Sequence, residues 1–194
     1  MKYAFFQGCN IPIRIEQYAN ATIAVFIKFD IELQIIPDFY CCGYPVRNVD
    51  EKAYILPSVR NMAIAEKAGL DILVVCNCCF ASLQKDRNML IKKCDLKDEL
   101  NTMLAKENLQ YQGKAKIKHF LTVLHDDVGT DKIKSKLVHK FKDLKLSLIH
   151  GCHVLRPREI TQFDNSFVPA VTENLMKTAG VTSLDWQGKL ECCG

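Results

Sequence analysis

Ten cysteines stand out in this chain of 194 residues, because thiols can bind soft metal ions or take part in redox chemistry. They occupy positions 9, 41, 42, 76, 78, 79, 94, 152, 192 and 193. The first residues show no secretory signal, since charged residues interrupt the short apolar run by Arg14. We therefore expect a cytoplasmic protein with reduced thiols. Metal binding, redox chemistry or both are then the roles that the sequence favours for these cysteines.

Cysteines follow three of the predicted strands. Cys9 follows the first strand, Cys41 and Cys42 follow the second, and the run Cys76-Asn77-Cys78-Cys79 follows the third. Because the carboxyl ends of parallel strands meet in one crevice, thiols far apart in sequence can converge there. Five thiolates exceed the four ligands of a tetrahedral zinc site. The spacing therefore points to iron–sulfur chemistry, or to zinc with a spare redox thiol.

The cysteine pattern is partly repeated along the chain. The apolar strand, polar residue, Gly and Cys that end at Cys9 return at Cys152, and Cys41-Cys42-Gly43 returns as Cys192-Cys193-Gly194. The second copy lacks the final motif with two cysteines three positions apart. We therefore expect the second repeat to be incomplete, with the chain about one third short of two full copies.

Alternating strands and helices are expected to position these motifs. Apolar runs predict strands at residues 2–6, 32–36, 72–75 and 146–149. Helical periodicity covers residues 11–29, a segment with Pro57 near its first turn and Gly69 as its stop, and residues 80–109. The lysine-rich segment 114–145 is expected to be helical and solvated.

The remaining candidate residues carry weaker signals. His150 and His153 flank Cys152 and could be zinc ligands, hydrogen-bond donors or pocket residues, whereas His119, His125 and His139 are expected at the surface. Arg47 and Arg156 lie close to cysteine motifs and could bind an anionic substrate or pair with structural carboxylates. Cys94 has no counterpart in either repeat and is expected to be structural or incidental.

Composition and charge exclude several classes of protein. With 48% hydrophobic and 25% charged residues, the chain is neither disordered nor of low complexity. The formal net charge of +4 is too small to indicate a nucleic acid or a membrane surface as partner. No stretch approaches the ~20 apolar residues of a transmembrane helix.

Taken with their flanking residues, the cysteine motifs resemble a known family. The segments that carry the resemblance are Gly8-Cys9, Tyr40-Cys41-Cys42-Gly43-Tyr44-Pro45, Cys76-Asn77-Cys78-Cys79-Phe80 and His150-Gly151-Cys152-His153. They are similar to the CCG domains in the B-subunit of heterodisulfide reductase. The resemblance covers nearly the whole chain.

The resemblance implies a fold, a cofactor and partners. It implies an α/β fold of two tandem CCG domains with Rossmann-like alternation, the first over residues 1–143 and the second, incomplete, over 144–194. Each domain of the family holds a noncubane [4Fe-4S] cluster that serves to cleave a disulfide, coenzyme M–S–S–coenzyme B. Its partners in the heterodisulfide reductase complex are a ferredoxin-like iron–sulfur subunit and a flavin subunit.

The ligands follow from the same resemblance. Those of the first cluster are Cys9, Cys41, Cys42, Cys76 and Cys79, with Cys78 as an alternative to one of the last two. Those of the incomplete second cluster are Cys152, Cys192 and Cys193. Two other functions remain open: an electron-transfer CCG subunit of another complex, such as a sulfur-oxidising one, and a structural zinc protein.

Overall fold

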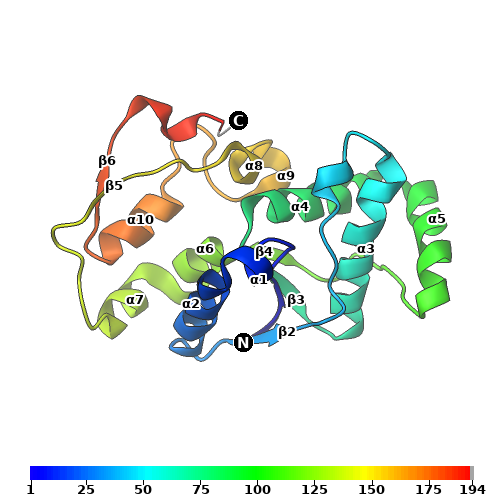
Figure 1. Cartoon of the computed structure of the whole chain (residues 1–194), viewed down its shortest axis with the longest axis horizontal. Helices are drawn as coiled ribbons and strands as arrows, with labels where there is room; N and C mark the ends of the chain where they lie inside the picture. The colour runs from blue at the N-terminus through cyan, green and yellow to red at the C-terminus, as the bar shows by residue number, and fades with distance from the viewer. Residues whose placement is uncertain (193–194) are drawn as a thin grey trace. The chain divides into compact units, whose positions relative to one another are not determined.

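The computed structural model describes residues 1–192, and the chain divides into two compact units. The first unit is Met1–Lys118 and the second begins at His119. Figure 1 shows the course of the chain. Each unit is described by itself below.

Strands and helices alternate in the first unit. Its strands are β1 (Lys2–Phe6), β2 (Glu32–Ile35), β3 (Asp71–Val74) and the start of β4 (Ile117–His119). Its helices are α1 (Ile11–Arg14), α2 (Glu16–Ile27), α3 (Glu51–Lys67), α4 (Asn77–Lys92) and α5 (Cys94–Leu104), with 3-10 turns η1 (Tyr44–Val46) and η2 (Ala105–Glu107). The α/β fold class predicted from the sequence is confirmed.

The strands form one sheet in the order β2-β1-β3-β4, and β1 runs parallel to both β2 and β3. Phe5 lies opposite Ile35 on one side and Leu73 on the other. From β1 the chain turns first to one side of the sheet and then to the other. The carboxyl ends of β1 and β3 therefore flank a topological switch point, the place where open α/β sheets bind ligands.

The sheet is held by a core of large apolar side chains. Phe5, Phe6, Ile72 and Leu73 are at most 1% exposed, as expected for strands covered on both faces. Helices α3, α4 and α5 pack against one another at one end of this unit (Figure 1). A rigid core thus lies directly behind the strand ends that carry cysteines.

Helix α3 begins earlier than the sequence predicted. Its start is set by Asp50, whose side chain accepts a hydrogen bond of 2.7 Å from the N–H of Ala53. Pro57 therefore lies inside the helix and not in its first turn. The helix ends at Lys67, and Gly69 follows with φ = 69°, which is the stop that the sequence predicted.

Three other expectations are also corrected. The helical stretch expected over residues 80–109 is divided at Lys93, whose φ of −113° and ψ of 79° are not helical. The lysine-rich segment 114–145 is not uniformly helical, because it begins with the strand β4. His119 is 0% exposed and not at the surface, and its ring packs edge-on against that of Phe163 at 5.0 Å.

The second unit is smaller and has short elements. It contains α6 (Phe120–Thr122), a π-helix η3 (Val123–Gly129), α7 (Thr130–Lys136), α8 (Cys152–Leu155), α9 (Arg158–Thr161), α10 (Val171–Thr178) and η4 (Gln187–Leu190). Strands β5 (Lys145–Ser147) and β6 (Thr182–Leu184) pair in parallel. The alternation of strand and helix is therefore repeated here.

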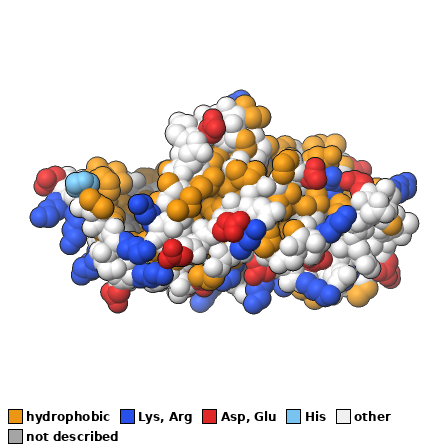
Figure 2. Space-filling model, turned by 90° about the horizontal axis from the view of Figure 1, so that it is seen from below, with side chains coloured by type: hydrophobic (Ala, Val, Ile, Leu, Met, Phe, Trp, Pro, Cys, Tyr) orange, Lys and Arg blue, Asp and Glu red, His pale blue; other side chains and the backbone are white. Residues whose placement is uncertain are grey.

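The described residues contain no helix that is long and apolar enough to cross a membrane. On the face shown in Figure 2, basic and acidic side chains both occur, with hydrophobic side chains exposed between them. This mixture agrees with the modest formal charge of +4.

Candidate metal centre

Three loops bring cysteines to the carboxyl end of the parallel sheet. Gly8-Cys9 follows β1, Cys41 and Cys42 lie on the connection after β2, and Cys76 follows β3 directly before α4. Their position matches the switch point between β1 and β3. Chain segments more than 60 residues apart thus contribute to one site.

The thiols contact one another in a chain. The thiol of Cys79 lies within hydrogen-bond reach of the sulfurs of both Cys42 and Cys76. Cys41 is hydrogen-bonded to Cys9 and lies next to Cys42. All five predicted ligands of the first cluster are therefore brought together.

These contacts and the local backbone set the ionisation of the thiols. The thiol of Cys79, followed by backbone N–H groups of Cys79 and Cys78, lowers the pKa of Cys76 to about 6 against the effect of burial. The thiol of Cys79 also lowers the pKa of Cys42 to about 7, with help from the N–H of Tyr44. The two neighbouring sulfurs, of Cys42 and Cys76, and burial raise the pKa of Cys79 itself. Anionic sulfur is the form that binds metals.

Cys41 differs from its neighbour Cys42. Burial raises the pKa of the Cys41 thiol to about 11, and the nearby Cys42 and Cys9 add to this effect. The N–H of Gly43 acts in the opposite direction. A metal ion would have to displace the proton of Cys41, because ligand thiols bind as thiolates.

Two glycines allow close packing at the cysteine loops, one against a sulfur and one against the backbone of α3. A Cβ atom at Gly8 would lie 3.0 Å from Cys79 Sγ, at a φ of 72°. A Cβ atom at Gly43 would lie 2.1 Å from the carbonyl oxygen of Tyr54, at a φ of 79°. Only glycine combines this conformation with such a close approach.

Helix α3 fixes the loop that carries Cys41 and Cys42. The buried amide of Asn61 accepts from the N–H of Tyr40 at 2.8 Å and donates to the carbonyls of Tyr40 at 3.1 Å and Cys41 at 3.3 Å. Ser58 Oγ donates to the carbonyl of Cys42 at 2.8 Å. Sequence reasoning missed both roles, although two polar residues three positions apart on an otherwise apolar stripe are a usable signal.

Two arginines stabilise tyrosines that flank the site. Arg60 stacks on the ring of Tyr40 at 3.9 Å and forms an ion pair with Glu107 at 2.7 Å. Arg47 stacks on Tyr44 at 3.9 Å and donates to its carbonyl at 3.3 Å. Arg47 thus contacts an aromatic ring where the sequence suggested an anionic substrate or a carboxylate.

Burial of the five thiols is uneven. Cys42 and Cys79 are buried, Cys41 and Cys76 are intermediate, and Cys9 is exposed. The site is therefore closed beside α4 and open beside the loop after β1. A ligand from solvent would reach it on the side of Cys9.

Cys78 and Cys94 differ in their relation to this site. The side chain of Cys78 hydrogen-bonds Cys76, so the structure brings the alternative ligand to the site as well. Cys94 is exposed at the start of α5. Cys94 takes no part in the contacts among the five predicted ligands.

In the second unit, Cys152 begins α8 after Gly151, whose φ is 82°. Its Sγ lies 3.7 Å from that of Cys192, so these two predicted ligands are also brought together. Cys193 lies outside the described residues.

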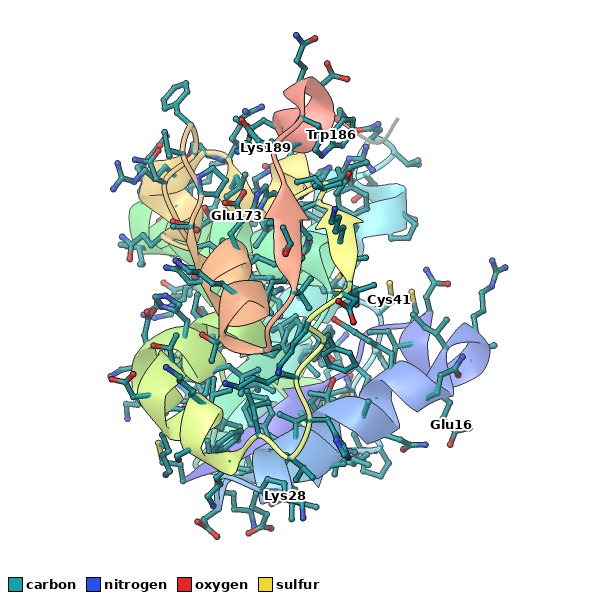
Figure 3. All side chains as sticks on the ribbon, turned by 90° about the vertical axis from the view of Figure 1, so that its left-hand side faces the viewer. Glu16, Lys28, Cys41, Glu173, Trp186 and Lys189 are labelled. Carbon is teal, nitrogen blue, oxygen red and sulfur yellow. The ribbon has the colours of Figure 1, made fainter. Side chains whose placement is uncertain are left out.

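His150 Nε2 lies 3.6 Å from Glu173 Oε1, and Lys189 approaches the same carboxylate at 3.5 Å (Glu173 and Lys189 are labelled in Figure 3).

The donor set of the first unit fits a polynuclear group better than a single ion. Among residues 1–192, no three Cys, His, Asp or Glu side chains surround one point that could hold one metal ion. The five sulfurs instead lie one beside the next, and Gly8 lets the backbone pass close to Cys79 Sγ. Thiolates spread over several loops are the ligands expected for iron–sulfur clusters.

Comparison with known proteins agrees with this geometry. The sequence model of the CCG family, described as a cysteine-rich domain, matches residues 3–84 and 146–194. The chain is 30% identical, over its full length, to the B-subunit of the ferredoxin/F420H2-dependent CoB-CoM heterodisulfide reductase of Methanosarcina acetivorans, of which it covers 65%. It is 31% identical to the 8-methylmenaquinol:fumarate reductase membrane anchor subunit of Wolinella succinogenes, of which it covers 67%.

A third curated relative, from Archaeoglobus profundus, is named as a protein like the B-subunit of heterodisulfide reductase; it is 29% identical, and the chain covers 66% of it. The chain thus spans about two thirds of the length of these relatives. A crystal structure of a hypothetical protein from Helicobacter pylori shares the fold with a TM-score of 0.69 at 11% identity. That match covers 98% of this chain and 34% of the other.

Proposed function

Because the chain belongs to the CCG cysteine-rich domain family, we propose that it is an iron–sulfur oxidoreductase subunit of the same type as the B-subunit of heterodisulfide reductase. In this proposal Cys9, Cys41, Cys42, Cys76 and Cys79 hold one noncubane [4Fe-4S] cluster. The cluster serves the reductive cleavage of a small-molecule disulfide. The convergence of five thiols at the switch point of the sheet carries the proposal.

The chain's own residues define what the site can do. The backbone N–H groups of Gly43, Tyr44, Cys78 and Cys79 point at sulfurs, and such hydrogen bonds tune the reduction potential of a cluster. The exposed side at Cys9 admits a substrate, whereas the buried side at Cys42 and Cys79 excludes water. When bound, the cluster supplies electrons one at a time next to a soft-metal site for sulfur.

The overall reaction takes up two electrons and two protons. The sulfur–sulfur bond of the disulfide breaks, and each sulfur leaves as a thiol once it has gained one electron and one proton. An electron-donating partner must supply the electrons. We propose a ferredoxin-like iron–sulfur subunit for this role, linked in turn to a flavin subunit, by similarity to the relatives from heterodisulfide reductases.

The second unit is proposed to contribute to a second cluster site of the same kind. Its ligands would be Cys152, Cys192 and Cys193, as part of a CCG domain that begins near residue 144. The contact of 3.7 Å between the first two sulfurs supports this assignment. The glycine before Cys152 repeats the Gly8-Cys9 arrangement of the first unit.

An electron-transfer role in a different complex is the second candidate. One relative is named as part of a methylmenaquinol:fumarate reductase, so CCG chains of this similarity are not confined to heterodisulfide reductases. Activity with coenzyme M–S–S–coenzyme B and an artificial electron donor separates the two candidates. Cleavage supports the first, and rapid cluster oxidation and reduction without cleavage supports the second.

Metal analysis of the anaerobically purified protein tests the cluster itself. We expect about four iron and four acid-labile sulfide ions for the site of the first unit. Cys42→Ser and Cys79→Ser should lose most of this iron, whereas Cys94→Ser should keep it because Cys94 lies outside the site. Stoichiometric zinc without sulfide would refute the redox proposal and leave a metal-stapled scaffold.

A further inference from the structure

Beneath the cysteine site lies a carboxyl group that the proposed cluster does not use. Asp86 lies on α4, two turns after Cys79, and is 0% exposed. No donor meets hydrogen-bond geometry at either carboxyl oxygen among the described residues, and the same holds for the buried hydroxyl of Ser82. A fully buried carboxyl with no such donor requires an explanation.

The polar neighbours of Asp86 connect it to Cys42. The hydroxyls of Ser58 and Tyr54 face its carboxyl from α3, and Ser82 lies one helical turn before it and faces the sulfur of Cys42. Ser58 is the direct link, because its Oγ also donates to the carbonyl of Cys42.

The hydrogen-bond inventory favours a proton on Asp86. A serine hydroxyl has one hydrogen, and that of Ser58 is engaged by the carbonyl of Cys42. Ser58 can donate to an ionised Asp86 only by giving up that bond, whereas its lone pairs can accept from a protonated carboxyl without doing so. Tyr54 can donate to the ionised form. An isolated ionised carboxylate at full burial is costly, so the surroundings favour the neutral acid.

We propose that Asp86 is a proton-holding residue of the cysteine site: at pH values where the oxidised site leaves its carboxyl ionised, Asp86 binds a proton from solvent when the site gains an electron. The proposal rests on the proposed iron–sulfur function and deepens it. The added electron makes the site more negative, which favours the neutral carboxyl. The step balances: one electron from a one-electron donor goes to the site, one proton goes to a carboxyl oxygen, and no bond between heavier atoms changes.

The charges around Asp86 agree with this role. Burial, with a smaller contribution from the nearby Cys42, raises its pKa to about 7, and Ser58, Tyr54 and Lys85 act in the opposite direction. Tyr111 also lies within electrostatic reach of the carboxyl. Asp86 acts through its neighbours on the site, so it is a positioning residue and not one that touches substrate.

The test is the pH dependence of the reduction potential of the loaded protein. The reduction potential is measured by spectroscopic titration against an electrode with mediator dyes, at pH values from 5 to 10. It should fall with rising pH in part of this range. For one proton per electron, a tenfold change in proton concentration corresponds to at most ~59 mV. In Asp86→Asn the side chain keeps its size and shape but cannot ionise, so the reduction potential of this variant should no longer fall with pH. Asp95→Asn, at an exposed position on α5, should keep the wild-type slope.

Two further measurements test the proposal even if Asp86→Asn folds poorly. In the wild type, the infrared difference between reduced and oxidised protein should show a carboxyl band gained on reduction. Tyr54→Phe removes a donor to the ionised form and should move the sloping region to higher pH.

The possible results separate the two proposals. If iron and sulfide are absent, the iron–sulfur function fails, and with it this inference. A loaded wild type with a flat potential, or an Asp86→Asn variant that binds iron and keeps the slope, overturns the role of Asp86 alone.

Discussion

Replacing Gly43 by alanine tests whether the loop of Cys41 and Cys42 is held where the structure places it. The residue has φ = 79°, where an L side chain costs about 1–2 kcal/mol. Its Cβ would also lie 2.1 Å from the carbonyl oxygen of Tyr54, a backbone atom of α3 that cannot rotate away. Forcing the loop off the helix adds roughly 1–3 kcal/mol, as overpacking does elsewhere.

A matched control separates the two contributions. Gly69 has nearly the same conformation, φ = 69°, but a Cβ there would meet nothing within 4 Å. Gly69→Ala therefore keeps only the conformational cost of about 1–2 kcal/mol. Gly43→Ala should lose roughly 2–5 kcal/mol, the sum of both contributions.

Two assays measure the effect. Urea unfolding followed by circular dichroism under reducing conditions gives the free energies of unfolding. Iron content gives the functional consequence, because moving this loop breaks the hydrogen bond from Ser58 Oγ to the carbonyl of Cys42. We expect low iron in Gly43→Ala and normal iron in Gly69→Ala. Equal losses of stability and equal iron in the two variants would refute the reasoning.

Three further predictions concern buried polar groups. Asn61→Ala leaves the carbonyl of Cys41 without its amide donor, so it should lower the free energy of unfolding by about 2–4 kcal/mol and reduce the iron content. Asn101 makes similar amide hydrogen bonds to the backbone of Tyr111, away from the cysteines, so Asn101→Ala should keep its iron. Burial raises the pKa of Asp86 from about 3.9 to about 7, so the contribution of this residue to the free energy of unfolding should fall by up to ~4 kcal/mol as pH rises from 4 to 7. Urea unfolding of Asp86→Asn at the same pH values should not show this fall. Burial lowers the pKa of His119 to about 3, so the contribution of this residue to the free energy of unfolding should fall as pH drops from about 6.5 to 3. A His119→Gln variant whose stability falls with acid in the same way as the wild type would contradict this.

The sequence predicted the sheet of the first unit and the meeting of the thiols because both depend on short-range signals. Strands β1 and β3 are compact apolar runs that are followed within three residues by a cysteine, and β2 is stopped by Pro37. Parallel pairing then places the carboxyl ends of these strands together, wherever the helices between them begin and end. The five cysteines could therefore be assigned to one site without any knowledge of side-chain contacts.

The errors arose where a tertiary or capping interaction outweighed the local pattern. Asp50 caps α3 and moves its start ahead of Pro57, which the proline rule alone placed near the first turn. His119 follows a polar, lysine-rich stretch, yet its ring packs against Phe163 and is fully buried. Charge composition describes the average of such a segment and cannot identify the one residue that turns inward.

The supports of the cysteine site were also beyond a reading of the cysteines alone. Asn61 and Ser58 reach the loop from α3, and Ser82 and Asp86 lie below it on α4. Each is a polar residue on a helix face that otherwise packs into the core. Polar residues at core positions are costly unless they bind something, and here the described partners are the backbone and sulfur of the cysteine loop.

The uneven burial of the thiols gives the site two sides with different roles. Cys9 is the most exposed of the five thiols, so a sulfur compound from solvent would approach on its side. Cys42 and Cys79 are buried, and a charge added to the site is felt most strongly there because water is excluded. Compensation of that charge must then come from within the protein, and Asp86, at 0% exposure on the same helix, is placed to provide it. In the proposed function, substrate binding and charge compensation therefore fall on opposite sides of the five sulfurs.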